Sequence, residues 1–97
     1  MIKYLENESD FKEIVKEGLY LVDFYADWCG PCKMLGTELE KLENISILKI
    51  NTDLFTDLAL SFGVMSIPAI FLLKDGEVVK NTIGYKNIDE LQEFIKI

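Results

Sequence analysis

The chain has 97 residues, enough for one compact hydrophobic core and too few for two, so we expect a single domain over residues 1–97. Hydrophobic residues make up 49% of the sequence and charged residues 28%, a balance that is typical of globular proteins and excludes a disordered chain. With 10 Lys and Arg against 17 Asp and Glu, the net charge of −7 repels phosphate groups, so neither nucleic acid nor a membrane surface is an expected partner.

The N-terminal segment and the lengths of the apolar runs indicate the cellular compartment of the protein. Residues 1–4 lead directly into Glu6, Glu8 and Asp10, without the basic start and apolar run of a secretory signal. The longest apolar stretches, such as residues 67–73, are too short to span a bilayer. We therefore expect a cytoplasmic protein, and we expect it to be a monomer.

Two elements are predicted before the cysteines. Phe11, Ile14 and Val15 recur at helical spacing, and Gly18 stands where this first helix would stop. Residues 19–25 are rich in β-forming residues and are apolar on both alternating faces. This pattern indicates a central strand that is covered on both sides.

Alternation of helices and strands continues after the cysteines. Three leucines fall on one stripe of a second helix: Leu35, Leu39 and Leu42. Residues 45–51 are typical of another strand, and residues 57–62 of a short helix closed by Gly63. The alternation favours parallel pairing of these first strands.

The last third of the chain adds a hairpin and a final helix. Residues 69–73 and 77–83 flank Asp75-Gly76, a pair that suits the positive φ angles of a type I′ turn. The sheet should therefore be mixed. Asn87 and Glu90 resemble a capping box at the start of a helix. Four apolar residues share one face of that helix: Ile88, Leu91, Phe94 and Ile95.

The candidate reactive residues are the two cysteines of the segment Trp28-Cys29-Gly30-Pro31-Cys32. Cys29 stands at a helix N-terminus, where free NH groups and the helix dipole stabilise a thiolate, the nucleophilic form of cysteine. Cys32 follows within one helical turn, close enough to attack a mixed disulfide on Cys29. Pro31 costs no hydrogen bond in the first turn, and Gly30 leaves the approach to sulfur open. We interpret Cys29 as the attacking residue and Cys32 as the resolving one.

Two other interpretations of the cysteine pair are open. A structural disulfide over so short a loop would contribute only about 2 kcal/mol in the chain-entropy model, and a cytosolic reducing pool would tend to open it. A structural zinc site needs four ligands, whereas this chain offers two cysteines and no histidine. Redox chemistry is the favoured interpretation.

Nearly the whole chain resembles the thioredoxin family. The similarity begins with the strand over 21–25 and the segment 26–34 that holds the cysteines, and it continues through Gly63-Val64-Met65-Ser66-Ile67-Pro68, the strand over 69–73, the turn at 74–77 and Gly84. The resemblance implies the α/β thioredoxin fold, a central mixed β-sheet of about five strands flanked by about four helices. It also implies an enzyme that acts as an electron carrier and reduces protein disulfides through a redox-active Cys29/Cys32 pair. No cofactor is expected, and the expected partners are a thioredoxin reductase and disulfide-containing proteins.

The resemblance assigns catalytic roles to two further residues. Asp23 matches the buried acid that exchanges protons with the resolving cysteine, and burial should raise the pKa of such a carboxyl. The alternative is a polar residue exposed at the edge of the sheet. Lys49 matches a lysine near that acid, although a strand lysine that reaches out to solvent is an equally simple interpretation.

A substrate-binding groove is also implied by the resemblance. Its expected residues are Trp28, Gly30, Pro31, Ile67, Pro68 and Gly84. The family holds a cis-proline opposite the cysteines, so the Ile67-Pro68 bond is expected to be cis. The backbone of Ile67 would then bind extended substrate chains by strand addition, which gives affinity without demanding one sequence.

Three positions depart from the family pattern. Tyr25 stands where many members have tryptophan, Ala69 where threonine is usual, and Thr37 where a proline commonly kinks the second helix. Without the kink the second helix could be straighter and the surroundings of Cys29 different, so the resemblance does not predict the reduction potential. The motif can also work as an oxidant or isomerase, and the chain could instead be a redox-independent subunit or assembly partner of a larger complex.

Overall fold

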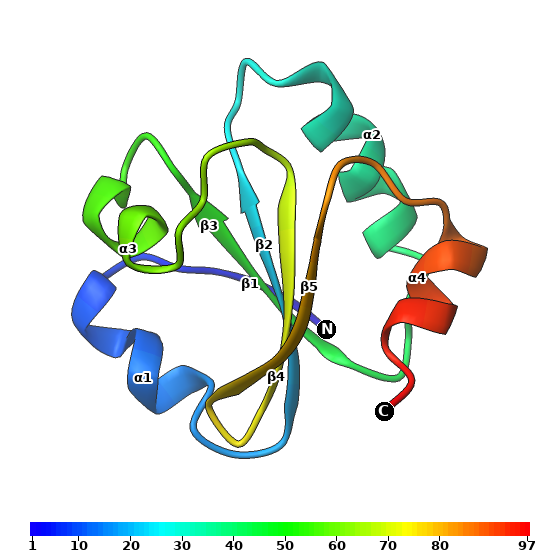
Figure 1. Ribbon diagram of the computed structural model, residues 1–97, viewed down its shortest axis with the longest axis horizontal. Helices are drawn as coiled ribbons and strands as arrows, with labels where there is room; N and C mark the ends of the chain where they lie inside the picture. The colour runs from blue at the N-terminus through cyan, green and yellow to red at the C-terminus, as the bar shows by residue number, and fades with distance from the viewer.

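The computed structural model describes residues 1–97 as one five-stranded sheet between two layers of helices (Figure 1). The strands are β1 (Ile2–Tyr4), β2 (Leu19–Tyr25), β3 (Ser46–Asn51), β4 (Ala69–Lys74) and β5 (Glu77–Ile83). The helices are the 3-10 turn η1 (Glu8–Asp10), then α1 (Phe11–Ile14), α2 (Gly30–Leu39), α3 (Thr56–Ser61) and α4 (Ile88–Phe94). None of the helices has both the length and the apolar character that a membrane span requires.

The sheet is mixed, as the hairpin signal predicted. Its strand order is β1-β3-β2-β4-β5, with β2 in the centre. Strands β1 and β2 both run parallel to β3, whereas β4 runs antiparallel to β2 and to β5. At the hairpin turn Asp75 and Gly76 both have positive φ, 50° and 83°, as a type I′ turn requires.

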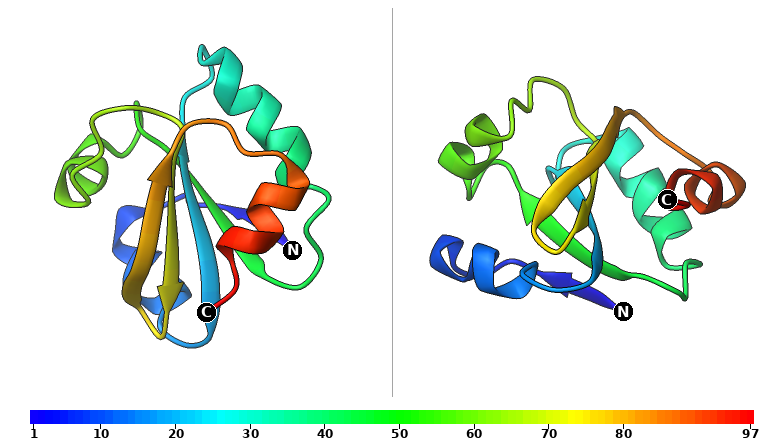
Figure 2. Two further views of the ribbon diagram at one scale, coloured as in Figure 1. Left: turned by 45° about the vertical axis from the view of Figure 1, so that its right-hand side comes forward. Right: turned by 60° about the horizontal axis from the view of Figure 1, so that its bottom comes forward.

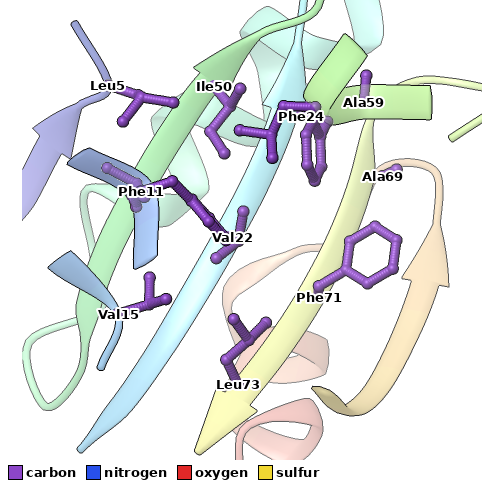
Figure 3. Close-up of a cluster of buried hydrophobic side chains, with 12 residues drawn as sticks. Leu5, Phe11, Val15, Val22, Phe24, Ile50, Ala59, Ala69, Phe71 and Leu73 are labelled. Carbon is purple, nitrogen blue, oxygen red and sulfur yellow. The ribbon is translucent and has the colours of Figure 1, made fainter. Parts of the chain in front are cut away.

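Two hydrophobic cores lie on opposite faces of the sheet. Helices α1 and α3 cover one face and α2 and α4 the other, as two further views show (Figure 2). Side chains alternate along β2, so that Val22 and Phe24 point into the first core while Leu21 points into the second. Figure 3 shows the first core, in which Phe24 and Phe71 pack edge to face.

The structure corrects several boundaries. Strand β1 was not predicted, because three residues with one half-buried side chain give no alternating pattern. Helix α2 ends at Leu39, so Leu42 lies beyond it, although its side chain is still buried in the second core. The first helix is a single turn after η1. The capping box of α4 is confirmed, because Asn87 and Glu90 each accept the other's backbone NH.

Candidate active site

The N-terminus of α2 holds both cysteines. Cys29 is the N-cap residue, and its Sγ accepts a hydrogen bond from the backbone NH of Cys32 at 3.2 Å. The two residues form a disulfide, with their Cα atoms 5.2 Å apart. Pro31 stands in the first turn, where its missing NH costs nothing. An anion on the Cys29 sulfur is therefore stabilised by a directed NH and by the helix dipole.

Burial does not distinguish the two cysteines. An attacking cysteine is expected to be exposed, but in the disulfide form Cys29 is 5% exposed and Cys32 is 2% exposed. The difference between the two residues lies in hydrogen bonding, because the sulfur of Cys29 is the one that receives the helix NH. No group of three or more potential metal ligands surrounds either cysteine.

Asp23 is fully buried in the middle of β2. Its side chain lies on the sheet face that α2 and α4 cover, and neither carboxyl oxygen has a hydrogen-bond partner. Burial raises the pKa of Asp23 from 3.8 to about 7, and the charge of Lys49 opposes part of that rise. The edge-exposed interpretation is therefore wrong, because β2 is the central strand.

Lys49 is the neighbour of Asp23 in the sheet. The two residues are register partners across β2 and β3, and the Lys49 Nζ lies 3.8 Å from Asp23 Oδ2. The lysine side chain is only 11% exposed, so it does not extend into solvent. A small pocket of about 190 Å³ is lined by both Lys49 and Cys32. Lys49 therefore contacts the Asp23 carboxyl and also lines a pocket with Cys32.

A shallow apolar groove lies next to the cysteines. It has a volume of about 240 Å³ and is lined by Trp28, Thr52, Thr56, Ala59, Leu60, Val64, Met65 and Ile67. The Ile67-Pro68 peptide bond is cis, as the resemblance implied. The Ile67 carbonyl lies 4.0 Å from the Cys29 sulfur, and the Gly84 NH donates to the Pro68 carbonyl at 2.8 Å. The residues expected to bind substrate therefore lie together at one end of the sheet, where β2 ends and β4 begins.

Trp28 is a surface residue and not part of the core. The residue is 72% exposed, and its indole NH donates to Asp53 Oδ2 at 3.0 Å. We did not identify Asp53 from the sequence, because it lies 25 residues from Trp28 and no local pattern marks it. Gly30 is exposed as well, and a Cβ there would meet no atom of the protein. The fold itself therefore has room for a side chain at that position.

Thr37 leaves α2 continuous. The helix runs without interruption from Gly30 to Leu39, and the Thr37 hydroxyl donates to the Lys33 carbonyl at 3.4 Å. A threonine keeps the backbone NH that a proline would lack. The buried Ala69 begins β4 and pairs with Phe24 of β2.

Comparisons with known proteins agree with this geometry. The family model described as Thioredoxin matches residues 2–97. Thioredoxin of Bacillus subtilis is 43% identical over 93 residues, covering 91% of this chain and 89% of the relative. Thioredoxin of Listeria monocytogenes is 43% identical over 100 residues, covering 98% of this chain and 96% of the relative.

Solved structures show the same fold. A mutant thioredoxin from Halobacterium salinarum matches with a TM-score of 0.88 and 33% identity, covering 97% of this chain and 87% of that one. An oxidised mitochondrial thioredoxin from Saccharomyces cerevisiae matches with a TM-score of 0.86 and 34% identity, covering 97% and 92%. The chain therefore belongs to the thioredoxin family, has the thioredoxin fold and is a protein dithiol–disulfide oxidoreductase.

Proposed function

We propose that this protein works as a reductant of protein disulfides, with Cys29 as the nucleophile and Cys32 as the resolving residue. The observation that carries the proposal is the hydrogen bond from the Cys32 NH to the Cys29 sulfur at the start of α2. A donor aimed at one sulfur stabilises negative charge on that sulfur and not on the other. Because of this asymmetry, Cys29 attacks the substrate first and Cys32 reacts in the second step.

The reaction exchanges one disulfide for another. The Cys29 thiolate attacks a substrate disulfide, forms a mixed disulfide and releases one substrate thiolate. Cys32 then loses its proton, and its thiolate attacks the Cys29 sulfur of the mixed disulfide. The second substrate thiolate leaves, and the Cys29–Cys32 disulfide remains. Two electrons pass from the cysteine pair to the substrate, so the pair itself holds the electrons and no cofactor is needed.

Asp23 is the proposed acceptor of the Cys32 proton. Burial raises its pKa to about 7, which suits proton exchange near neutral pH. The pocket shared by Cys32 and Lys49 has room for water that could relay the proton. Lys49 stabilises the Asp23 carboxylate, the form that must be present before the proton is transferred.

Substrate binding is assigned to the apolar groove and its rim. Trp28 offers an exposed aromatic surface beside Cys29, and the Ile67 backbone lies against the reactive sulfur. An extended segment that pairs with this backbone would place its disulfide over Cys29. Pro31, Gly30, Pro68 and Gly84 complete this rim.

A separate thioredoxin reductase would restore the dithiol after each turnover, so the protein would carry electrons from the reductase to its substrates. We place this electron transport in the cytoplasm, where thiols are kept reduced. We also propose that the protein acts as a monomer.

Replacing both cysteines by serine tests the proposed function. With dithiothreitol as electron donor, the wild-type protein should accelerate insulin reduction, followed as turbidity. The variant Cys29→Ser/Cys32→Ser should give the rate of dithiothreitol alone, because it has no sulfur to exchange. A double variant that kept the wild-type rate would contradict the proposal. A double variant that lost the rate yet still completed a cellular complex would indicate a redox-independent second role.

Limiting alkylation tests the order of the two cysteines. When reduced protein meets substoichiometric iodoacetamide near neutral pH, we expect Cys29 to carry most of the label, because its thiolate is stabilised by the helix N-terminus. Peptide mapping by mass spectrometry measures the ratio. Equal or preferential labelling of Cys32 would reverse the roles assigned here. Protein unfolded in denaturant is the control, since both thiols should then react alike.

A further inference from the structure

Two tyrosine rings flank the ammonium group of Lys49. The Nζ atom lies 4.8 Å from the ring centroid of Tyr25 and 5.5 Å from that of Tyr4. Both distances are within the range of an attractive cation–π contact. The three residues come from β2, β1 and β3, so the sheet itself brings them together. Tyr4 is the register partner of Lys49, which makes the short strand β1 part of the arrangement.

The tyrosines also contact each other, and α2 leaves room above the lysine. Their rings meet edge to face, with centroids 6.1 Å apart. On the helix side, a Cβ at Gly36 would lie 3.2 Å from the Lys49 Nζ, so glycine there gives the ammonium its space. The ammonium is thus bounded by two ring faces, by the backbone of α2 and by the Asp23 carboxyl.

The position of this ammonium determines how strongly the Asp23 carboxylate is stabilised, because Asp23 has no other polar partner. Neither oxygen of its carboxyl accepts a hydrogen bond, and Lys49 is the single cation in contact with it. A lysine side chain has many rotamers, and an ammonium free to move toward water would interact more weakly with the carboxylate. Contacts that restrict the ammonium therefore strengthen its effect on Asp23.

We propose that Tyr4 and Tyr25 form an aromatic cage that holds the Lys49 ammonium against Asp23, and that both tyrosines are positioning residues for the proton transfer. The inference rests on the proposed role of Asp23 as proton acceptor for Cys32. Neither tyrosine needs to touch substrate or sulfur for this role. The burial of Tyr25, together with the nearby Asp27 carboxyl, raises the pKa of its phenol.

The charged and titratable groups around Asp23 are few. Lys49 faces it from β3, and Tyr4 and Tyr25 stand behind the lysine. Cys32 and Lys33 of α2 and Asp27 of the preceding loop line the same pocket as Lys49. In the disulfide form Cys32 does not titrate. The oxidised protein therefore separates the titration of Asp23 from that of the cysteines.

The test is the pKa of Asp23 in the oxidised protein, read from the carboxyl ¹³C shift in an NMR titration. Tyr4→Leu should raise this pKa by about half a unit, because the released ammonium stabilises the carboxylate less. Tyr4→Phe keeps the ring and should leave the pKa unchanged. Tyr25→Leu and Tyr25→Phe should repeat the pattern. Tyr4 is 55% exposed, so replacing it should not prevent folding.

The variant Lys49→Met tests whether the tyrosines change the pKa of Asp23 through the lysine or in another way. In this background Tyr4→Leu should cause no further shift, since no ammonium remains to be held. An unchanged pKa in Tyr4→Leu alone, an equal shift with and without Lys49, or an equal shift in Tyr4→Phe would overturn the cage. A lower pKa in Tyr4→Leu would also overturn it, because the ring would then act by excluding water.

Activity separates this inference from the function on which it rests. If Asp23 accepts the proton, Tyr4→Leu should shift the acid limb of the pH–rate profile for insulin reduction to higher pH. The shift should equal the increase in the pKa of Asp23. A shifted pKa with an unchanged rate profile would leave the cage in place and refute the proton-transfer role of Asp23. Coincident shifts would support both.

Discussion

A Cys32→Ser variant is expected to accumulate a covalent complex with its substrate. Cys29 can still attack a disulfide, but no second thiol lies within reach to release the mixed disulfide. Intramolecular attack has an effective concentration far above that of any added thiol, so multiple turnover should fall by about a thousandfold or more. Non-reducing electrophoresis of the variant with a disulfide-containing protein should show a one-to-one adduct, and mass spectrometry should map it to Cys29.

Cys29→Ser is the matched control for this trap. It removes the sulfur that accepts the helix NH and leaves Cys32, whose sulfur accepts no such hydrogen bond. We expect neither an adduct nor turnover from it. Addition of dithiothreitol should dissolve the adduct of Cys32→Ser and return free substrate. Equal adduct formation by the two single variants would show that the cysteines are interchangeable, which the hydrogen bond at the N-cap does not allow.

An Asp23→Asn variant is expected to be more stable than the wild-type protein at pH 8 by up to about 4 kcal/mol. Burial raises the pKa of Asp23 from 3.8 to about 7, so the folded state holds its proton more tightly than the unfolded state. The stabilising contribution of protonation is fully present below pH 3.8, declines as the pH rises, and is lost above the folded pKa of about 7. Asparagine cannot ionise and avoids this loss.

Denaturant unfolding of the oxidised proteins at pH 3.5 and pH 8 measures the difference. The gain from Asp23→Asn should shrink in acid, where the wild-type carboxyl is protonated as well. Asp27→Asn removes one charge from an exposed position and should change stability little at either pH. Asp23→Asn should also reduce insulin more slowly near pH 7, because Cys32 loses its proton acceptor. Equal stability at pH 8 with an undiminished rate would identify Asp23 as a residue without a catalytic role.

Most of the fold was predictable because its elements have local signals. The apolar run of β2, the Asp75-Gly76 turn and the capping box of α4 each depend on residues within one short segment. Strand β1 depends instead on its pairing with β3, more than 40 residues away in sequence, and its three residues have no pattern of their own. The end of α2 was also missed, since Leu42 is buried in the same core although it is no longer helical.

The site was predictable in its residue types and less so in its contacts. The spacing of Cys29 and Cys32 indicated their chemistry, and the resemblance supplied Asp23, Lys49 and Pro68. The hydrogen bond from Trp28 to Asp53 joins two loops that the sequence keeps apart. The contacts of Tyr4 with Lys49 likewise require the strand order, which no local pattern of residues shows.

The two ends of the sheet differ in structure. The cysteine pair and the Ile67-Pro68 bond lie at the end of the sheet where β2 ends and β4 begins, whereas at the opposite end Gly18 and Asp75 join two loops by a pair of hydrogen bonds of 2.8 and 2.9 Å. Figure 1 places the β4–β5 turn and the start of α2 at opposite extremes of the molecule. A large folded protein can therefore present its disulfide to one face alone and never approach the opposite end. If substrates bind at this end, as proposed above, we expect the fold to place no limit on the size or shape of the rest of the substrate.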